Sequence, residues 1–372
     1  MLTTTIFPGR YVQGYDALRS LGKEIKRFNE KALLLVDPYV LENIFPSFEE
    51  TLQGVIEYKA EPFGGESSDE EIERVSQIVR DEGFKVLVGL GGGKTLDTAK
   101  AVAYQTVLPM VIVPTIASTD AATSALAVIY TPEGEFDRYL FLPHNPDLVL
   151  VDTRVIAEAP VEFLVSGMGD ALATWFEAES ARQNYAPNMT GNLGSITAYA
   201  LAELCFDTLL EHGVDARTAC EANAVVPALE KIVEANTLLS GLGFESGGLA
   251  AAHAIHNGFT VLEASHHAYH GEKVAFGVLA SLYLTGKPAD LIDRVYTFCE
   301  NVGLPTTLED LGMEDVSDED LMRVAEAATD EDETIHNEPM PVTADMVFAA
   351  LKTADAEGRQ RLAAFQTPHQ ES

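Results

Sequence analysis

The sequence predicts an α/β domain followed by an all-α domain, and three observations support this prediction. In the first half, short runs rich in β-branched residues alternate with stretches that place apolar residues at helical spacing. This alternation is typical of a parallel sheet covered by helices. In the second half such runs nearly vanish, and Ala and Leu recur at helical spacing. The chain of 372 residues is also long enough for two domains.

The elements of the first half can be placed in order along the chain. Strands are expected at the apolar, β-branched runs 32–37, 55–58, 85–90, 110–114 and 148–151. Helices are expected over 16–29, 69–82 and 95–106. The runs 124–130 and 136–142 flank the turn sequence Thr-Pro-Glu-Gly-Glu at 131–135, which favours a β-hairpin. This order of elements is that of a dinucleotide-binding domain.

The second half is expected to be helical, most clearly over 170–182, 196–211 and 220–239. We place the domain boundary near Pro160. Residues 1–160 then form the α/β dinucleotide-binding domain, and residues 161–372 form the all-helical domain. The polar C-terminal end, 366–372, is expected to fray.

Charge and composition exclude several classes of protein. The chain has 58 acidic and 24 basic residues, a net charge of −34, and the acidic residues are scattered. Nucleic acids and anionic membranes are bound by clustered Lys and Arg, so neither is expected as a partner. The acidity fits a salt-adapted host or an ordinary acidic bacterial enzyme, and composition does not separate the two. Without a membrane-spanning run or a signal sequence, the protein is expected in the cytoplasm. The three cysteines lack CxxC spacing and are expected to be buried thiols.

A glycine-rich segment, Gly-Leu-Gly-Gly-Gly-Lys-Thr at 89–95, lies between a predicted strand and a predicted helix. Backbone N–H groups in such a loop can bind a pyrophosphate. Val88 stands where a Walker A loop needs glycine, and Lys94 stands where a Rossmann fingerprint needs its third glycine. The segment therefore matches neither motif, and a glycine-rich turn without a ligand is the alternative.

Asp37 ends the first predicted strand, where a carboxylate could accept hydrogen bonds from an adenosine ribose and favour NAD over NADP. The alternative is an Asp that begins a turn before Pro38.

The most unusual feature of the second half is a concentration of histidines. Five of the nine lie close together: His253, His256, His266, His267 and His270. Imidazole is a common ligand of zinc and other first-row metals, and a catalytic site usually has three protein ligands and an open position. Asp170, after a glycine-rich turn, is a candidate carboxylate ligand, with a helix N-cap as its alternative. Spacing alone does not choose among the histidines.

Five longer motifs resemble the iron-containing alcohol dehydrogenase superfamily, and most closely its glycerol dehydrogenase branch. They lie at 91–100, 114–121, 130–139, 169–178 and 243–253. The likeness runs from about Pro8 to about Arg361. It implies a dehydroquinate synthase-like fold, in which an α/β dinucleotide-binding domain precedes an all-α domain.

The resemblance also implies roles for individual residues. It makes Asp170, His253 and His270 the metal ligands and catalytic residues, with secondary roles for His256, His266 and His267. It makes Asp120 a substrate-binding residue, together with the three ligands. The implied NAD-binding residues are Asp37, Gly92, Gly93, Lys94, Asp97, Thr115, Ser118, Leu126, Val128 and Tyr130.

The implied activity is NAD-dependent, metal-assisted oxidation of glycerol and related vicinal diols, giving dihydroxyacetone from glycerol. A metal ion would act as a Lewis acid on the alcohol. The resemblance favours Zn²⁺, although N and O ligands also suit Fe²⁺ or Mn²⁺. The pocket is expected between the two domains, and the resemblance implies a homo-oligomer, an octamer.

Two other functions are alternatives to this implied activity. The first is a relative acting on another diol or on glycerol 1-phosphate. A phosphate ester calls for extra Lys or Arg, of which the helical motifs offer few beyond Lys273. The second is a non-catalytic NAD-binding protein. A complete set of Asp170, His253 and His270 argues against it, because such a protein has no physical need for a metal triad.

Overall fold

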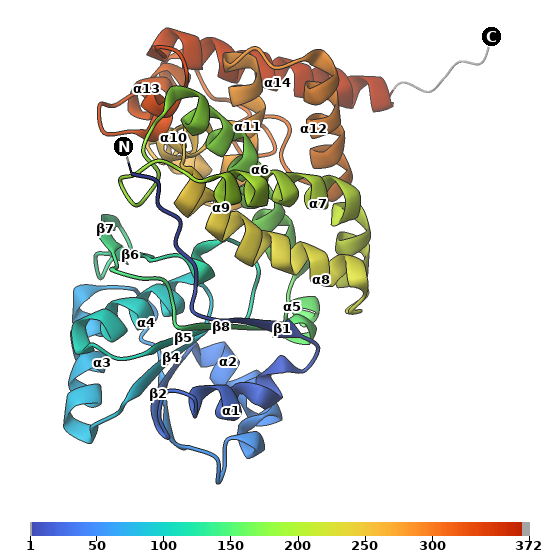
Figure 1. Cartoon of the computed structure of the whole chain (residues 1–372). Coiled ribbons are helices and arrows are strands. Elements are labelled where there is room, and N and C mark those ends of the chain that lie inside the picture. Colours follow the sequence, from blue (N-terminus) through green and yellow to red (C-terminus); the bar gives the residue numbers. More distant parts are fainter. Residues whose placement is uncertain (1, 367–372) are drawn as a thin grey trace. The chain divides into compact units, whose positions relative to one another are not determined.

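The computed structural model describes residues 2–366, which form two compact units. The sheet unit comprises Ile6–Leu164 and Thr218–Gly241. The helical unit comprises the described residues of Met1–Thr5, Val165–Arg217 and Leu242–Ser372. Figure 1 follows the chain through both units. The fraying expected of the polar C-terminal end falls outside the described residues.

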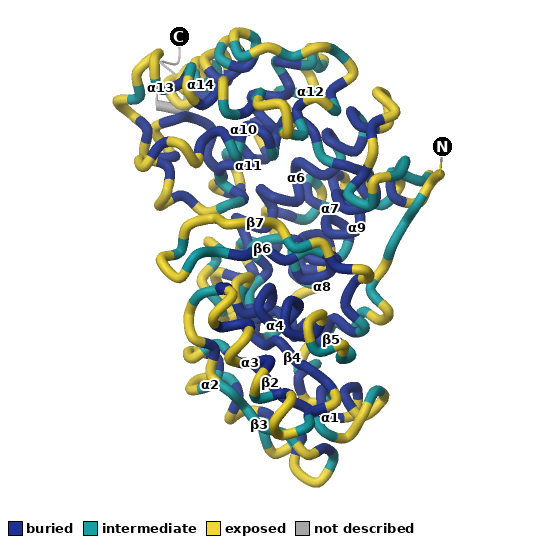
Figure 2. Tube along the Cα trace, turned by 90° about the vertical axis from the view of Figure 1, so that its left-hand side faces the viewer, coloured by how far each residue is buried: buried dark blue, intermediate teal, exposed yellow. Residues whose placement is uncertain are grey.

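The sheet unit contains a six-stranded parallel sheet in the order β1-β8-β5-β4-β2-β3. Its strands are β1 (Tyr11–Gly14), β2 (Lys31–Val36), β3 (Glu57–Pro62), β4 (Val86–Gly91), β5 (Met110–Pro114) and β8 (Leu148–Asp152). Of the four inner strands, β4, β5 and β8 are buried at every residue, and Figure 2 shows β4 as a dark tube. Strands covered on both faces are apolar throughout, which is why the apolar runs of the sequence predicted them.

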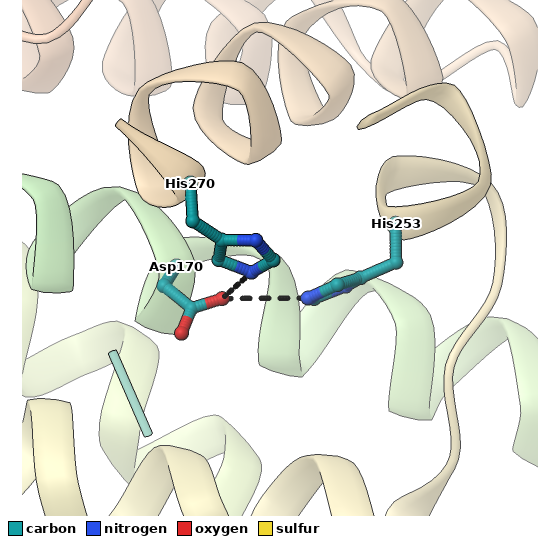
Figure 3. Close-up of side chains that lie close together, drawn as sticks. All are labelled: Asp170, His253 and His270. Atoms are coloured by element: carbon teal, nitrogen blue, oxygen red, sulfur yellow. Dashed lines mark ion pairs between the residues drawn. The ribbon is translucent and has the colours of Figure 1, made fainter. Parts of the chain in front are cut away.

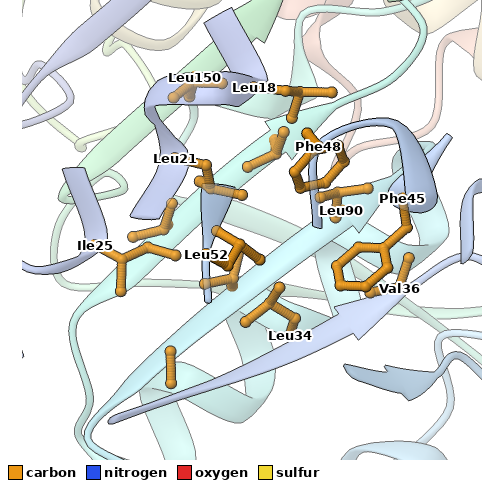
Figure 4. Packing of buried hydrophobic residues seen from close by; sticks show 14 of the residues in the cluster. Leu18, Leu21, Ile25, Leu34, Val36, Phe45, Phe48, Leu52, Leu90 and Leu150 are labelled. Atoms are coloured by element: carbon orange, nitrogen blue, oxygen red, sulfur yellow. The ribbon is translucent and has the colours of Figure 1, made fainter. Parts of the chain in front are cut away.

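Helices cover both faces of this sheet. The helices of the sheet unit are α1 (Leu21–Ile25), α2 (Pro38–Asn43), α3 (Asp69–Glu82), α4 (Gly93–Thr106), α5 (Thr153–Glu158) and α8 (Pro227–Glu234), of which α8 packs against α5. On one face, Leu34 and Leu90 lie in a buried cluster with Leu21 and Phe48 (Figure 4). Burying each such side chain contributes about 1.5–3 kcal/mol. On the other face, a Cβ on Gly89 would lie 2.5 Å from the Cβ of Ala99. Glycine there lets α4 pack directly on β4.

The hairpin predicted after β5 is confirmed. Strands β6 (Leu126–Tyr130) and β7 (Phe136–Phe141) pair antiparallel as a separate two-stranded sheet. Its base is held by Lys100 of α4, which is fully buried and donates through Nζ to the carbonyl oxygen of Leu126 at 2.7 Å.

The helical unit also follows the prediction for the second half. Its helices are α6 (Val161–Asn184), α7 (Ile196–Glu221), α9 (Ser240–Gly247), α10 (Ala251–Phe259), α11 (His270–Leu284), α12 (Ala289–Val302), α13 (Asp318–Ala328) and α14 (Ala344–Gln366). Three of them, α6, α7 and α9, extend by a few residues into the sheet unit. Helix α11 is buried along most of its length and packs against α10, α12 and α14. Its apolar character on all sides reflects this central position.

Two segments differ from the predicted division at residue 160. The described residues of Met1–Thr5 lie in the helical unit, although the predicted α/β domain includes them. Residues Thr218–Gly241 lie in the sheet unit, although the predicted helical domain includes them. Gln13 of β1 donates through Nε2 to the carbonyl oxygen of Glu230 at 2.8 Å, and the hydroxyls of Tyr11 and Thr237 are 2.7 Å apart. Helical periodicity predicts a helix and its apolar face, but it does not indicate which unit that face covers.

Several elements differ from the sequence prediction in length or position. The helix expected over 16–29 is a 3-10 turn, Ala17–Ser20, followed by the short α1. The segment 220–239 divides into the end of α7, then α8 and a π-helical turn at Ala235–Leu239. Strand β1 was not predicted, and β3 begins two residues after the expected start. Both are edge strands with partly exposed residues, so they lack the continuous apolar run on which the prediction depended.

Within residues 2–366, no helix combines the length and apolarity needed to cross a membrane. The three cysteines, Cys205, Cys220 and Cys299, are buried and unbridged, as predicted.

Candidate metal centre and cofactor-binding loop

Three side chains from three helices of the helical unit meet at one point. Asp170 comes from α6, His253 from α10 and His270 from the first residue of α11 (Figure 3). Oδ1 of Asp170 is 3.3 Å from Nε2 of His253 and 3.2 Å from Nε2 of His270. One ligand atom from each residue lies within 4.8 Å of the other two, and no other such group occurs among residues 2–366. Two imidazole nitrogens and one carboxylate oxygen form a donor set that suits zinc, iron or manganese.

Glycines bring these helices together. Asp170 lies inside α6, nine residues after its start at Val161, so its alternative reading as a helix N-cap is wrong. The preceding Gly169 is also helical, and a Cβ there would lie 2.3 Å from the carbonyl oxygen of Gly271. A Cβ on Gly271 would in turn lie 1.7 Å from the carbonyl oxygen of Ser166. The glycines therefore allow the backbones of α6 and α11 to touch, which brings Asp170 beside His270.

The electrostatics of the cluster favour an ionised carboxylate. Burial raises the pKa of the Asp170 carboxyl, but His270 and His253 lower it more, so the net pKa lies well below its ordinary value. Burial likewise lowers the pKa of His253, but the Glu177 and Asp170 carboxylates raise it well above its ordinary value. Asp170, only 1% exposed, thus offers a buried negative charge beside two imidazoles. Such a group is suited to a cation.

Sequence reasoning missed Glu177, which contacts one of these histidines. It lies on α6, and its Oε2 is 2.6 Å from Nδ1 of His253. The available signal was its spacing of seven residues from Asp170, which places both carboxylates on one face of a helix. Spacing does not show what that face contacts.

The other three histidines of the cluster lie around the site or away from it. The rings of His256 and His270 are 4.2 Å apart between centroids, and Nδ1 of His256 is 3.0 Å from Oδ1 of Asn257. Burial, His270 and Lys273 lower the pKa of His256 well below its ordinary value. His266 is exposed, with Nε2 2.9 Å from the carbonyl oxygen of Thr260. His267 is also exposed and is not part of the ligand group.

The glycine-rich loop of the sheet unit connects β4 to α4. Gly92 is the N-cap of α4, and Gly93 and Lys94 form its first turn, where backbone N–H groups point out of the helix. A Cβ on Gly93 would meet nothing within 4 Å, so this turn has open space beside it. Nζ of Lys94 lies 2.6 Å from Oε2 of Glu66 and 4.8 Å from the centre of the Tyr130 ring. The loop thus presents an anion-binding helix terminus and a cation together.

Asp37 follows β2 and caps the next helix. Its Oδ1 accepts hydrogen bonds from the N–H groups of Tyr39 (2.9 Å) and Val40 (3.3 Å), at the start of α2. Asp37 therefore has the local structural role that was the alternative to ribose binding, because it caps the helix that begins at Pro38. A Cβ on Gly91 of the glycine loop would lie 2.8 Å from the Cβ of Asp37, so the cap and the loop are direct neighbours.

The hairpin residues of the predicted NAD site share one face. Leu126, Val128 and Tyr130 are the half-buried positions of β6, whereas the intervening Ala127 and Ile129 are buried. Alternate residues of a strand point to the same side, so the three side chains line one surface.

Asp97 is nearly buried between α4 and the hairpin. Its Oδ2 accepts the N–H of Val128 at 3.1 Å, and its Oδ1 is 3.4 Å from Nζ of Lys100. Burial raises the pKa of Asp97 despite Lys100. These contacts connect the helix of the glycine loop to the strand that carries Val128.

The remaining predicted residues follow β5. The N–H of Thr115 donates to the carbonyl oxygen of Gly91 at 3.0 Å, which brings Thr115 to the glycine loop. Ser118 lies three residues later in the same connection and is half-buried. Asp120 is 8% exposed, and its Oδ2 accepts a hydrogen bond from the hydroxyl of Ser240 at 2.6 Å.

Comparisons with known proteins show which family the chain resembles. The family model described as iron-containing alcohol dehydrogenase matches residues 8–153. A glycerol dehydrogenase of Thermotoga maritima is 66% identical, over 97% of this chain and 99% of its own. A glycolaldehyde reductase of Halobacterium salinarum is 47% identical, over 96% of this chain and 99% of its own. The solved structure of glycerol dehydrogenase from Schizosaccharomyces pombe is 40% identical, with a TM-score of 0.94, and the match covers 98% of this chain and 94% of that one.

These likenesses extend over nearly the whole chain, and they confirm the resemblance and the fold class that the sequence motifs indicated. The chain belongs to the iron-containing alcohol dehydrogenase family, in its glycerol dehydrogenase branch.

Proposed function

We propose that this protein catalyses the NAD-dependent oxidation of glycerol at its secondary hydroxyl, giving dihydroxyacetone. The main observation in support is the convergence of Asp170, His253 and His270, whose ligand atoms lie within 4.8 Å of one another. Membership of the glycerol dehydrogenase branch supports the substrate. These residues would hold a divalent metal ion, for which we propose Zn²⁺, and Fe²⁺ and Mn²⁺ suit the same donors.

The three ligands suit the chemistry that an alcohol oxidation needs. A divalent ion bound there would act as a Lewis acid and lower the pKa of the substrate hydroxyl. One carboxylate with two neutral imidazoles leaves net positive charge on such an ion, which favours a developing alkoxide. NAD, when bound, would supply the redox chemistry by accepting the hydride of the substrate carbon.

Other polar groups of the chain would bind and orient NAD and the polyol substrate. The backbone N–H groups of Gly93 and Lys94 and the ammonium of Lys94 would bind the pyrophosphate of NAD. For this Lys94 must exchange Glu66, its present partner, for the phosphate. We assign the ribose of the adenosine to Asp37, which keeps its role as a helix cap, and the polyol hydroxyls to Asp120. An ionised carboxylate accepts hydrogen bonds from hydroxyl groups in both cases.

The test is the formation of NADH with glycerol, propane-1,2-diol and glycerol 1-phosphate, each before chelation, after chelation and after zinc is restored. Glycerol-dependent turnover that chelation removes and zinc restores is expected. Turnover with the phosphate ester alone would overturn the substrate, and no turnover with any of them would overturn the enzymatic assignment. His270→Ala should remove metal binding and turnover together while the protein stays folded.

The likeness to a glycolaldehyde reductase supports one further substrate. Reduction of glycolaldehyde gives ethylene glycol, which is a vicinal diol like glycerol, so the same ligands would serve. NADH consumption with glycolaldehyde, compared with that with dihydroxyacetone, measures this preference. A much higher kcat/KM for glycolaldehyde would make it the principal substrate.

A further inference from the structure

We propose that Glu177 is the positioning residue that makes His253 a metal ligand, by fixing both the backbone and the ring of that histidine. This inference rests on the metal site proposed above. Glu177 lies two helical turns after Asp170 on α6 and is 1% exposed.

One carboxylate holds the start of α10 at three points. Oε1 of Glu177 accepts the N–H of Ala250 at 3.0 Å and the N–H of His253 at 2.9 Å. Its Oε2 lies 2.6 Å from Nδ1 of the His253 ring. Because the same side chain binds the backbone and the ring, it fixes where α10 begins and how the imidazole is turned.

These contacts also determine which ring nitrogen is available. An ionised carboxylate only accepts hydrogen bonds, so Nδ1 of His253 must carry the proton that Glu177 receives. Nε2 is then the nitrogen that can give its lone pair to a metal ion, and it is the one that faces Oδ1 of Asp170, at 3.3 Å. A carboxylate partner of this kind orients a ligating histidine and makes it more basic.

A second buried carboxylate separates this role from simple capping of the helix. Oε1 of Glu338 accepts the N–H of Ala251 at 3.1 Å, and Glu338 is 3% exposed. Glu338 thus caps the same helix end as Glu177. Glu338 accepts from the backbone of α10, whereas the His253 ring is held by Glu177, so Glu338 offers a matched control.

The discriminating substitution is Glu177→Gln, which preserves size. If the amide oxygen keeps the two N–H groups of α10, the amide NH₂ faces Nδ1 of His253, which must then accept. The ring proton moves to Nε2 and blocks the ligating atom. If the amide is rotated by 180°, its NH₂ group faces the two backbone N–H donors of α10 instead. Neither of those hydrogen bonds can then form. Either arrangement should weaken zinc binding by roughly 10–100-fold.

The experiment measures zinc affinity by competition with a chromogenic chelator for the wild-type protein, Glu177→Gln and Glu338→Gln. A loss for Glu177→Gln, with wild-type affinity for Glu338→Gln and similar melting temperatures of the two metal-free variants, supports the proposal. Equal zinc affinities for wild type and Glu177→Gln overturn it and leave the proposed function intact. A wild-type protein that binds no zinc overturns the metal site itself.

A second measurement decides the matter if Glu177→Gln does not fold. Nitrogen NMR of the zinc-loaded wild-type protein reports which ring atom of His253 carries the proton. Protonated Nδ1 is expected. A proton on Nε2 would overturn the proposal.

Discussion

Gly271→Ala tests whether the contact between α6 and α11 sets the geometry of the proposed metal centre. Gly271 is the second residue of α11, directly after His270. A Cβ at this position would lie 1.7 Å from the carbonyl oxygen of Ser166 and 2.9 Å from the amide nitrogen of Asp170. Both are backbone atoms of α6 and cannot rotate away, so the two helices must separate or tilt.

The size of that movement follows from the contact distances. Contacts of a Cβ below 3.0 Å are essentially never found, so the carbonyl of Ser166 and the new methyl must move apart by at least 1.3 Å from their 1.7 Å separation. The same movement acts on Oδ1 of Asp170 and Nε2 of His270, which are 3.2 Å apart. Overpacking of this kind costs about 1–3 kcal/mol of stability. A displacement of about 1 Å in a catalytic centre can cost on the order of 100-fold in turnover.

Zinc affinity, kcat with glycerol and melting temperature should therefore all fall in Gly271→Ala. The matched control is Gly93→Ala, also in the first turn of a helix, where a Cβ meets nothing within 4 Å. That variant should keep the zinc affinity and melting temperature of the wild type. A Gly271→Ala protein with wild-type zinc affinity and turnover would refute the argument that this close approach positions the ligands.

Three further predictions concern groups outside the ligand set. Lys100→Met leaves the Asp97 carboxylate buried without its cation, so chemical denaturation should show a loss of about 3–5 kcal/mol. The control is Lys59→Met, since Nζ of Lys59 lies 2.6 Å from Oε1 of Glu82 in an exposed ion pair, and it should lose less than about 1 kcal/mol. Equal losses would contradict the buried-pair argument. Asp37→Asn keeps the cap of α2 but removes the charge, so the kcat/KM ratio of NADP to NAD should rise at constant melting temperature; an unchanged ratio would leave the residue as a cap only. Burial raises the pKa of Glu338 from 4.5 to about 7, so its folded state takes up a proton and its contribution to stability is lost as pH rises from about 4.5 through 7. Glu338→Gln should show a smaller fall in melting temperature between pH 5 and pH 8, and an equal fall would contradict this assignment.

The sequence predicted best those elements whose own residues carry the signal. Helix α3 occupies the predicted range because Ser68 caps its start and Gly83, in the left-handed region at φ 70°, ends it. Strand β5 is an uninterrupted apolar run and also matches. The edge strand β3 carries charged residues, so its alternation was weak and its start was misplaced.

The site could be predicted only in part, because its geometry depends on contacts between distant segments. Asp170 was a candidate from its type, but its local sequence suggested a helix start, whereas Gly169 serves to pack against Gly271. Nothing in the segment around Asp170 predicts that packing, since its partner lies on another helix. Glu177 was missed for the same reason: its partners at the start of α10 become neighbours only in the folded unit.

The division of the sheet unit into two stretches of chain has a consequence for biosynthesis. Residues 165–241 take roughly 4–15 s to translate at about 5–20 residues per second, and until then the first stretch lacks its last helix. In that interval Leu229, Ile232 and Val233, which are fully buried in the finished protein, are not yet available to cover it. The nascent sheet unit therefore has an incomplete hydrophobic core while it is on the ribosome. A fragment that ends at Leu164 would lack the same three buried side chains and the helix that carries them.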